Sequence, residues 1–441
     1  MESIFRAYDI RGVFGTELTL EICEKIGKAV GTLVESEEFV AGYDTRIHSP
    51  KVFESFLKGI TSTGIDVVSV DMVPNPVAYF TSFKNKIPGA YITASHNPPE
   101  YNGIKLFRKD GSSYVDELNK IKEIIKNGKF KEGSGKVNEI DYALSDYEEY
   151  LHKRLDIEAD VKMVAECFHG SAGIITPSLF NSFDIETTPL NNEPKGDFGG
   201  LRPEPKPDNL EQLRKSVLSK KADFGIAFDG DSDRGVFVDD KGRVFLASTP
   251  GAIFIKDALS KKKGKIVLTI DCPNSIAKLA EENGGQPVWV RIGHGFIEEA
   301  LTKQNALFGL ELSSHFSFNT FYPFSDGILA ALKMAEILSK SSEKFSEMAD
   351  KIKINPTEKF YLKCKDHTHK EKVMQEIRKI FPEGKDCGDG IKILLNDEEW
   401  VLIRISQTNP EINICIEAKN EKRLKELVDR YTSIVEEKIN G

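Results

Sequence analysis

The stretch KIVLTIDCPNSIAKLAEENGGQPVWV, residues 265–290, decides the fold of this chain. Its apolar start predicts a buried strand, PNS predicts a loop, and IAKLAEENGG has the apolar spacing of a helix. The run PVWV predicts a second strand. A strand, a helix and another strand at this spacing indicate a βαβ unit, in which the two strands are parallel.

The same plan occurs twice earlier in the chain. In residues 39–71, FVAGYD and DVVSVD flank a polar loop and an amphipathic helix that ends near Gly64. In residues 161–190, VKMVAEC and DIETTPL flank the loop FHGSAG and a helical stretch. Units this far apart predict three similar α/β domains with mixed or parallel sheets, because solenoid repeats are much shorter.

The segment from about Pro356 onward follows a different plan. It contains a strand (KFYLKC), a helix (KEKVMQEIRKIF), strands within 391–406 and 412–418, and a helix over 421–438. This order predicts a smaller α+β domain with antiparallel strands.

Composition narrows the class of protein. The 441 residues exceed what one core organises, and 40% hydrophobic with 29% charged residues is typical of a soluble globular protein. No apolar run reaches the roughly 20 residues that span a bilayer, and the N-terminus does not resemble a signal peptide. We therefore expect a cytoplasmic protein with no membrane partner.

Cysteines and net charge exclude several kinds of site. The six cysteines are scattered, which argues against a zinc site and against a disulfide framework. A net charge of −9 gives no reason to expect nucleic acid as a partner. An anionic small substrate remains compatible with it, because local arginines and helix N-termini can bind anions.

The segment DGDSDR, residues 229–234, carries three carboxylates between the apolar runs FGIAF and GVFV. In a tight loop, Asp229, Asp231 and Asp233 would converge and repel one another unless a cation neutralises them. Oxygen ligands without Cys or His favour Mg²⁺ or Ca²⁺ over zinc. We therefore expect a metal site, with a solvated acidic turn as the alternative.

The same segment partly matches a calcium-binding EF-hand loop, with Asp240 at the twelfth position. That interpretation fails, because Arg234 occupies the place that needs glycine and the flanking runs predict strands.

The segment AYITASHNPP, residues 90–99, predicts a strand that ends in a loop halted by two prolines. Such a loop can present the Ser95 hydroxyl at the end of a sheet, where α/β proteins place their ligands. Serine needs a neighbouring base or cation to act as a nucleophile, and His96 and Lys105 are near in sequence. A helix-cap or turn serine is the commoner alternative.

Residues 309–315, GLELSSH, predict an extended segment with Glu311, Ser313 and His315 on one side. An acceptor, a hydroxyl and an imidazole on one side would suit the hydroxyls of a sugar. A polar strand edge is the alternative.

Two further segments could bind phosphate. In RISQTNP, residues 404–410, an arginine precedes two hydroxyls and an amide in a turn, although an ordinary Asn-Pro turn would look similar. In FRAYDIRG, residues 5–12, Arg11 could contact a phosphoryl group, whereas a surface arginine is the default expectation.

Taken together in their order along the chain, these five segments resemble the α-D-phosphohexomutases: phosphomannomutases, phosphoglucomutases and phosphoglucosamine mutases. The resemblance runs from Arg6 to Pro410, and TASHNP with DGDSDR is its most specific part. It implies an α/β fold with four domains around a central cleft, three of similar mixed-sheet topology and a smaller C-terminal α+β domain. We place the domains at residues 1–145, 146–246, 247–352 and 353–441.

The resemblance also implies roles for residues. Ser95 would be the phosphorylated residue, and one of its oxygens would complete a Mg²⁺ site with Asp229, Asp231 and Asp233. The residues around the reacting phosphoryl group would be Arg11, His96, Lys105 and Arg234, with Lys105 a candidate general acid or base. The substrate-binding residues would be Tyr8, His294, Glu311, Ser313, His315, Arg404, Ser406, Gln407 and Thr408.

The function implied is interconversion of hexose 1-phosphate and hexose 6-phosphate. It would proceed through a phosphoserine enzyme and a bound hexose 1,6-bisphosphate, which would also serve as activator. His294, His315 and Gln407 favour mannose and/or glucose as the sugar. Ser314 replaces the usual glycine of the sugar loop, and the phosphate loop ends in Thr-Asn-Pro; these departures keep phosphoglucosamine mutase as an alternative.

A different enzyme class also remains open: a Mg²⁺-dependent phosphatase or phosphotransferase with Asp229 as nucleophile. A binding protein that has lost turnover is less compatible with the presence of Ser95, Lys105 and Arg404. The sequence leaves the oligomeric state open between monomer and dimer.

Overall fold

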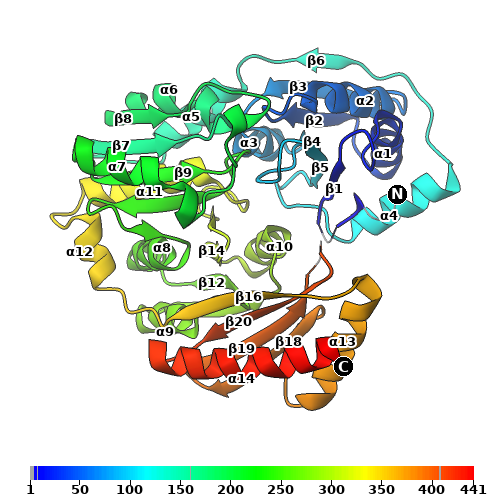
Figure 1. The fold of residues 1–441 in the computed structure, drawn as a ribbon. Helices are drawn as coiled ribbons and strands as arrows, with labels where there is room; N and C mark the ends of the chain where they lie inside the picture. Colours follow the sequence, from blue (N-terminus) through cyan, green and yellow to red (C-terminus); the bar gives the residue numbers. More distant parts are fainter. Residues whose placement is uncertain (1–3, 7, 159, 407–408) are drawn as a thin grey trace.

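Four β-sheets, one after another along the chain, organise the protein (Figure 1). The structure is a computed structural model and describes residues 4–6, 8–158, 160–406 and 409–441. The first three sheets are mixed and the fourth is antiparallel. The predicted fold class is therefore confirmed, whereas the domain boundaries stay a prediction.

The first sheet has six strands in the order β1-β5-β4-β2-β3-β6. β2, β3, β4 and β6 are parallel, and β5 runs antiparallel to both β4 and β1. Its strands are β1 (Ile10–Val13), β2 (Glu38–Tyr43), β3 (Asp66–Met72), β4 (Gly89–Ile92), β5 (Tyr101–Phe107) and β6 (Val137–Glu139). Its helices are α1 (Leu20–Leu33), α2 (Ser49–Thr61), α3 (Asn75–Asn85) and α4 (Glu117–Asn127).

The second sheet has the order β11-β10-β9-β7-β8. β7, β8 and β9 are parallel, and β10 and β11 are antiparallel to their neighbours. Its strands are β7 (Val161–Glu166), β8 (Ile185–Leu190), β9 (Phe224–Phe228), β10 (Gly235–Asp239) and β11 (Val244–Phe245). Its helices are α5 (Ala143–His152), α6 (Thr176–Ser182) and α7 (Glu211–Lys220), with 3₁₀ turns at Ser171–Ile174, Phe198–Gly200 and Pro207–Asn209.

The third sheet has the order β13-β12-β14-β15, with only β15 antiparallel to its neighbour. Its strands are β12 (Lys265–Thr269), β13 (Gln286–Val290), β14 (Phe308–Glu311) and β15 (His315–Phe318). Its helices are α8 (Ser248–Lys261), α9 (Asn274–Glu282), α10 (His294–Gln304), α11 (Gly327–Ser339) and α12 (Phe345–Asp350).

The fourth sheet is antiparallel throughout, in the order β16-β20-β19-β18-β17. Its strands are β16 (Thr357–Lys363), β17 (Lys385–Asp386), β18 (Gly390–Asn396), β19 (Glu399–Ile405) and β20 (Glu411–Glu417). Helices α13 (His367–Ile380) and α14 (Glu421–Asn440) pack on it around one apolar cluster.

One hairpin recurs in the first three sheets. The last of the parallel strands turns into an antiparallel neighbour: β4 into β5, β9 into β10, and β14 into β15. The connecting residues are 93–100, 229–234 and 312–314, and in the fourth sheet residues 406–410 connect β19 to β20. Four of the five segments with candidate chemistry therefore lie at turns that connect antiparallel strands.

The core joins the first three sheets. Helices α1, α2 and α4 share one apolar cluster on one face of the first sheet. α3 covers the other face and belongs to a second cluster that extends through the second and third sheets. Buried Asp326, which caps α11, accepts hydrogen bonds from the hydroxyls of Tyr147 on α5 (2.6 Å) and Tyr322 (2.7 Å). These contacts fix the sheets relative to one another.

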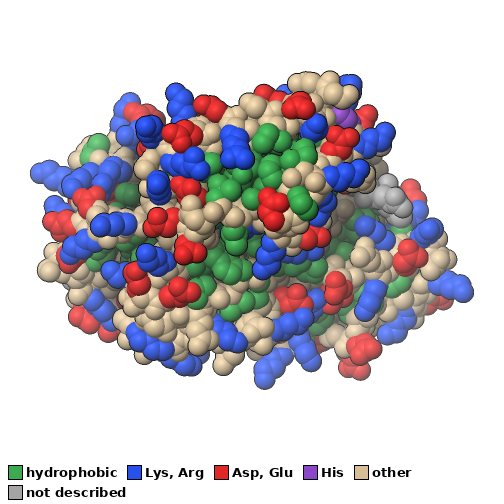
Figure 2. All heavy atoms as spheres, turned by 90° about the horizontal axis from the view of Figure 1, so that it is seen from below, with side chains coloured by type: hydrophobic (Ala, Val, Ile, Leu, Met, Phe, Trp, Pro, Cys, Tyr) green, Lys and Arg blue, Asp and Glu red, His purple; other side chains and the backbone are tan. Residues whose placement is uncertain are grey.

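The face seen in Figure 2 carries interspersed acidic and basic side chains, with hydrophobic side chains exposed between them. Among the described residues, no helix combines the length and apolarity needed to cross a membrane.

Candidate active site

Arg46 holds the loop that carries Ser95. Its side chain is 1% exposed, and its guanidinium also lies over the Phe198 ring, 4.9 Å from the centroid. The guanidinium donates to four backbone carbonyls at 2.7–3.1 Å, those of Ser95, Asn97, Pro98 and Tyr101. A rigid planar fork is suited to this task, because its five N–H groups have fixed directions.

Asp44 also stabilises the loop that carries Ser95. One carboxylate oxygen accepts from Arg46 Nε (3.0 Å) and from the Thr93 hydroxyl (2.8 Å). The Thr93 hydroxyl oxygen in turn accepts from the Ser95 backbone N–H at 2.8 Å. These hydrogen bonds fix the conformation of Ser95, whose backbone φ of 52° lies in the left-handed region. Such a φ costs a non-glycine residue about 1–2 kcal/mol.

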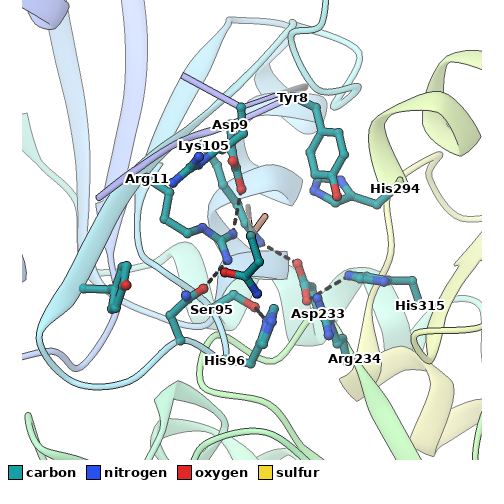
Figure 3. Close-up of a pocket in the computed structure, with 14 residues that line it drawn as sticks. Tyr8, Asp9, Arg11, Ser95, His96, Lys105, Asp233, Arg234, His294 and His315 are labelled. Carbon is teal, nitrogen blue, oxygen red and sulfur yellow. Dashed lines mark hydrogen bonds and ion pairs between the residues drawn. The ribbon is translucent and has the colours of Figure 1, made fainter. Parts of the chain in front are cut away.

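The Ser95 hydroxyl points across to the second sheet. Its Oγ donates to Asp229 Oδ2 at 2.7 Å. The same oxygen lies 3.1 Å from His96 Nδ1 (Figure 3). Gly230 permits this approach, because a Cβ there would lie 2.5 Å from the Ser95 carbonyl oxygen. The loops from two sheets thus meet at the serine oxygen.

The aspartate loop is also hydrogen-bonded to its other neighbours. The Asn75 amide at the start of α3 donates to the Asp231 carbonyl (3.0 Å), and the Gly235 amide donates to the Ser314 carbonyl (3.1 Å). Arg234 and His315 form an antiparallel bridge between the second and third sheets. Backbone contacts therefore set the register between the three loops.

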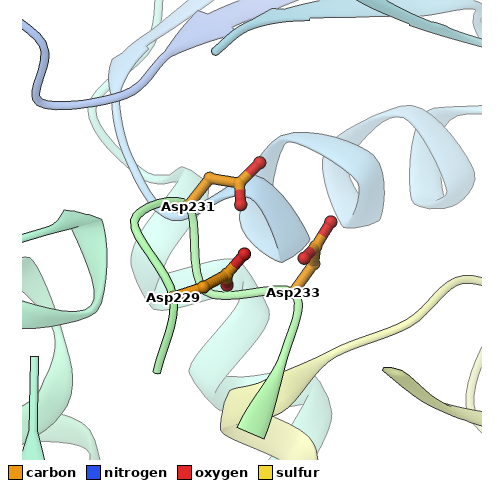
Figure 4. Close-up of side chains that lie close together, drawn as sticks. All are labelled: Asp229, Asp231 and Asp233. Atoms are coloured by element: carbon orange, nitrogen blue, oxygen red, sulfur yellow. The ribbon is translucent and has the colours of Figure 1, made fainter. Parts of the chain in front are cut away.

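The three aspartates converge, as Figure 4 shows. One carboxylate oxygen from each of Asp229, Asp231 and Asp233 lies within 4.8 Å of the others, and all three side chains are buried. Asp231 Oδ1 is a buried acceptor that has no hydrogen-bond partner in the part of the chain that the structure describes. An orphaned carboxylate oxygen in an all-oxygen set fits a hard divalent cation.

Lys105 balances part of the charge of this cluster, and the neutral Asn75 amide donates a hydrogen bond to it. Lys105 Nζ lies 2.8 Å from Asp231 Oδ2 and 2.6 Å from Asp233 Oδ2, and Asn75 Nδ2 donates to Asp233 Oδ2 at 3.2 Å. Burial lowers the pKa of Lys105, but the two carboxylates outweigh it and raise that pKa well above its usual value. Lys105 is therefore a cation at this site.

Two arginines complete the reacting end. Arg11 donates to Asn97 Oδ1 (2.5 Å) and to Asp9 Oδ2 (2.6 Å). Arg234 Nε lies 3.7 Å from Asp229 Oδ2. With Lys105 they border a cavity of about 330 Å³ that contains the Ser95 hydroxyl.

The sugar-loop prediction needs a correction. Glu311, Ser313 and His315 do not lie along one extended segment, because the chain reverses between Glu311 and His315, which pair directly across a hairpin. The turn has three residues, and its last, Ser314, has a φ of 69°. A three-residue hairpin that ends in a left-handed residue is a common solution, and it explains why glycine is favoured there.

Despite the turn, the three side chains meet. His315 Nε2 lies 3.3 Å from Asp233 Oδ1, and its Nδ1 lies 2.8 Å from Ser313 Oγ and 3.7 Å from Glu311 Oε2. Burial lowers the pKa of His315, more than Asp233 raises it. On a neutral ring, Nδ1 can accept from the Ser313 hydroxyl, while Nε2 faces the Asp233 carboxylate.

A second cavity of about 320 Å³ adjoins the first, since Tyr8, His96 and Asn409 line both. Arg404 and Ser406 line it, and Arg404 forms an ion pair with Asp389. Gln407 and Thr408 lie outside the described residues. Lysine and arginine side chains from other segments also line it, namely Lys359 and Arg291.

The structure brings the predicted residues together as follows. The first cavity is lined by Tyr8, Arg11, Ser95, His96, Lys105, Asp233, Arg234, His294 and His315. Sequence reasoning missed the supporting residues Asp9, Asp44, Arg46, Asn75 and Glu298. A local signal exists only for Asp44 and Arg46, at the end of the predicted strand FVAGYD and in the polar loop that follows it.

Family models for three successive domains match this chain. Their descriptions are phosphoglucomutase/phosphomannomutase alpha/beta/alpha domain I, II and III, and they match residues 2–132, 145–242 and 249–354.

Curated relatives match over the whole length. A phosphoglucomutase/phosphomannomutase from Thermococcus kodakarensis is 33% identical and is covered over 100% of both chains. A probable phosphoglucosamine mutase from Methanothermobacter thermautotrophicus is 34% identical, with 98% of each chain covered. Among solved structures, a phosphoglucomutase/phosphomannomutase family protein from Burkholderia thailandensis superposes with a TM-score of 0.90 at 27% identity, covering 99% of this chain and 98% of its own.

Proposed function

The chain belongs to the phosphoglucomutase/phosphomannomutase family, and we propose that it interconverts a hexose 1-phosphate and a hexose 6-phosphate through phosphorylated Ser95. It is a phosphohexomutase, an isomerase that transfers phosphate within one substrate. We further propose that it acts in the cytoplasm on soluble sugar phosphates.

The observation that carries this proposal is the 2.7 Å contact between Ser95 Oγ and Asp229 Oδ2. It places a hydroxyl from the first sheet against a buried carboxylate cluster from the second. In the first transfer, the bond from phosphorus to Ser95 Oγ breaks while a free hydroxyl of the hexose phosphate bonds to phosphorus, and the proton that this hydroxyl loses is balanced by the proton that Ser95 Oγ gains. In the second, the other phosphate of the resulting 1,6-bisphosphate returns to Ser95 Oγ.

The residues around the cavity have complementary tasks in this scheme. Arg11, Lys105 and Arg234 supply positive charge where the transferring group carries negative charge. Burial, Arg234 and Arg11 lower the pKa of His96 well below the usual value, so the ring is neutral. Its Nδ1 lies 3.1 Å from Ser95 Oγ. His96 is therefore placed to exchange a proton with the serine oxygen.

Asp229, Asp231 and Asp233 would hold one Mg²⁺ ion together with an oxygen of the phosphoserine. When bound, the ion would neutralise charge on the phosphoryl oxygens. The carboxylates that contact Lys105 would then contact both the ion and the Lys105 ammonium group. This arrangement would keep Lys105 near the transferring phosphoryl group.

The adjoining cavity supports the binding of the phosphate that is not reacting. Arg404 and Ser406 border it, as do Lys359 and Arg291, so three cationic side chains face one space beside the carboxylates of Asp389 and Glu411. A 1,6-bisphosphate intermediate must offer either phosphate to Ser95, and a cationic region of this kind can accept either one. Trace hexose 1,6-bisphosphate would restore enzyme molecules that have lost the phosphate on Ser95, and so act as activator.

We propose mannose and glucose phosphates as the substrates, and the support for this choice is that His294 and His315 line the cavity beside Ser95. The relatives named above carry both kinds of name at nearly equal identity, so similarity alone does not select the sugar. Glucosamine phosphate remains the alternative.

The aspartyl-phosphatase alternative has less support. Both oxygens of Asp229 are engaged, Oδ2 by the Ser95 hydroxyl (2.7 Å) and Oδ1 by the Arg234 backbone N–H (3.2 Å). Ser95 lines the first cavity, whereas Asp229 is not among the described residues that line it.

A coupled assay tests the proposal. Mannose, glucose and glucosamine 1-phosphates would each be supplied with Mg²⁺ and a trace of the matching 1,6-bisphosphate, and 6-phosphate formation would be followed. We expect turnover of the mannose and glucose compounds and its loss in Ser95→Ala. If none of the three sugars is converted, the proposed function is wrong.

A further inference from the structure

Glu298 is a buried carboxylate that connects two domains behind the cavity wall. It lies on α10, four residues after His294, and is 1% exposed. Its Oε1 lies 3.1 Å from His294 Nδ1. Its Oε2 accepts from the Ser113 backbone N–H at 2.8 Å, across from the first domain. One side chain therefore links the third sheet's helix to a turn of the first.

The His294 ring is placed by this link. It projects from α10 toward the middle of the cavity, with its centroid 4.7 Å from the Tyr8 ring, edge to face (Figure 3). Nδ1 is occupied by Glu298 and lies 3.4 Å from Ser113 Oγ. Among the described residues, His294 Nε2 has no protein hydrogen-bond partner, so this nitrogen is left for a ligand.

The position would otherwise disfavour a charged ring. His294 is the first residue of α10, and the N-terminus of a helix carries partial positive charge that repels a cation. Lys105 adds a further positive charge nearby. The Glu298 carboxylate lies one helical turn further along α10, on the same face as His294, and offsets both effects.

We propose that Glu298 is a positioning residue that holds His294 as a charged donor, with its Nε2–H directed at the sugar phosphate in the cavity. This inference rests on the proposed function, and it adds a specific hydrogen-bond donor and the residue that orients it.

The electrostatics agree with the geometry. Burial lowers the pKa of His294, but the charge and hydrogen bond of Glu298 outweigh burial and raise it above the usual value. Lys105 lowers this pKa and Asp233 raises it slightly, while the rings of Tyr8 and His315 border the imidazole. By contrast, burial lowers the pKa of His96 and of His315. Of the three histidines, His294 is thus the one whose surroundings favour the charged form.

The direct test is a ¹⁵N NMR titration of His294 in the full-length protein without substrate. In the wild type, His294 should titrate above 6.5, the value for an unperturbed histidine. In Glu298→Gln, which keeps the size but replaces one of the two acceptor oxygens with an NH2 donor and removes the charge, the pKa of His294 should fall by about one unit or more. The matched control is Glu299→Gln on the same helix, where Glu299 forms an ion pair with the exposed Lys303, and it should leave the titration unchanged.

Kinetics test the role in binding. Because His294 would lose its charge at lower pH in Glu298→Gln, kcat/KM should fall about tenfold at pH 8 and recover to within about threefold of wild type at pH 6. Inorganic phosphate should shift the His294 Nε2 resonance in the wild type, and more weakly in the variant at pH 8.

A purely structural role for Glu298 gives a different result. It would lower the melting temperature and reduce kcat/KM equally at pH 6 and pH 8, with the His294 titration unmoved. If Glu298→Gln does not fold, the wild-type titration decides, since a His294 pKa at or below 6.5 overturns the proposal. Absence of mutase activity in the wild type would instead refute the proposed function, and the NMR result would remain readable.

Discussion

The Arg46 guanidinium donates a hydrogen bond from Nη2 to the backbone carbonyl of Ser95 at 2.8 Å. This contact places the proposed nucleophile under the control of a residue 49 positions earlier in the chain. Since Ser95 has a left-handed φ of 52°, the loop depends on outside support to keep its hydroxyl against Asp229. Arg46 is a positioning residue in this account, because it contacts only the backbone of the loop.

Replacing Arg46 with lysine should therefore damage both stability and activity. Lysine has three donors on a flexible stem, so several of the buried carbonyls would lose their partners, at a cost of about 2–4 kcal/mol. We expect kcat to fall at least about tenfold because the Ser95 hydroxyl is no longer fixed. Urea denaturation and the coupled assay measure the two effects. Arg154→Lys, at an exposed arginine, is the control and should change neither; wild-type kcat in Arg46→Lys would contradict the assigned role.

Ser314→Gly should be tolerated and should stabilise the protein slightly. Ser314 has a φ of 69°, and glycine adopts this region without the cost that a Cβ imposes. After the entropy cost of glycine, we expect a gain of about 0.5–1 kcal/mol in the free energy of unfolding, with kcat/KM within about twofold. Ser314→Val should be destabilised by more than about 1 kcal/mol, because branched residues fit poorly at positive φ. The opposite order of melting temperatures would show that the turn is not as described.

Mg²⁺ should stabilise the wild-type protein through the aspartate loop. A ligand that binds only the folded state adds about 2.7 kcal/mol at a concentration one hundred times its dissociation constant. We expect the melting temperature to rise with Mg²⁺ and the chelator EDTA to abolish turnover reversibly. Asp231→Asn should lose this Mg²⁺-dependent increment, whereas Asp429→Asn at an exposed site on α14 should retain it. An unchanged increment in Asp231→Asn would place the ion elsewhere.

Asp326 should make the junction between the second and third sheets sensitive to pH. Burial raises the pKa of Asp326 from 3.8 to about 6, although the hydroxyls of Tyr147 and Tyr322 oppose the shift. A carboxyl whose pKa is raised in the folded state contributes stability below pH 4 that is lost as the pH rises through 6. The shift corresponds to about 3 kcal/mol. The destabilisation caused by Asp326→Asn should therefore be largest near pH 4 and shrink toward pH 7. Chemical denaturation across this range measures it, and a pH-independent difference would contradict the assignment.

The sequence predicts those parts of the site that lie in short local motifs. Ser95 and the three aspartates stand in turns after apolar strands, so their placement follows from the strand pattern. Arg46, Glu298 and Asn75 escaped prediction, because each acts on a partner distant in the chain: Asn75 reaches Asp233 across 158 positions, and Glu298 reaches Ser113 across 185. Tertiary packing decides which polar side chain forms hydrogen bonds with which loop.

The error at the sugar loop has a similar cause. Alternation of polar residues in residues 311–315 is compatible with a strand, and the turn is revealed only by the pairing of Glu311 with His315. Ser314 occupies the left-handed position of the turn, where a glycine would have indicated the turn from the sequence. The βαβ plan, in contrast, was readable because it rests on long apolar runs.

The central claim is that Ser95 carries the transferred phosphoryl group. The most direct measurement is intact and peptide mass spectrometry of the wild type and of Ser95→Ala after incubation with glucose 1,6-bisphosphate and Mg²⁺. The account predicts an acid-stable increase of about 80 Da in the wild type, mapped to Ser95, and no increase in Ser95→Ala. A phosphate that is acid-labile, maps to Asp229 or persists in Ser95→Ala would contradict it.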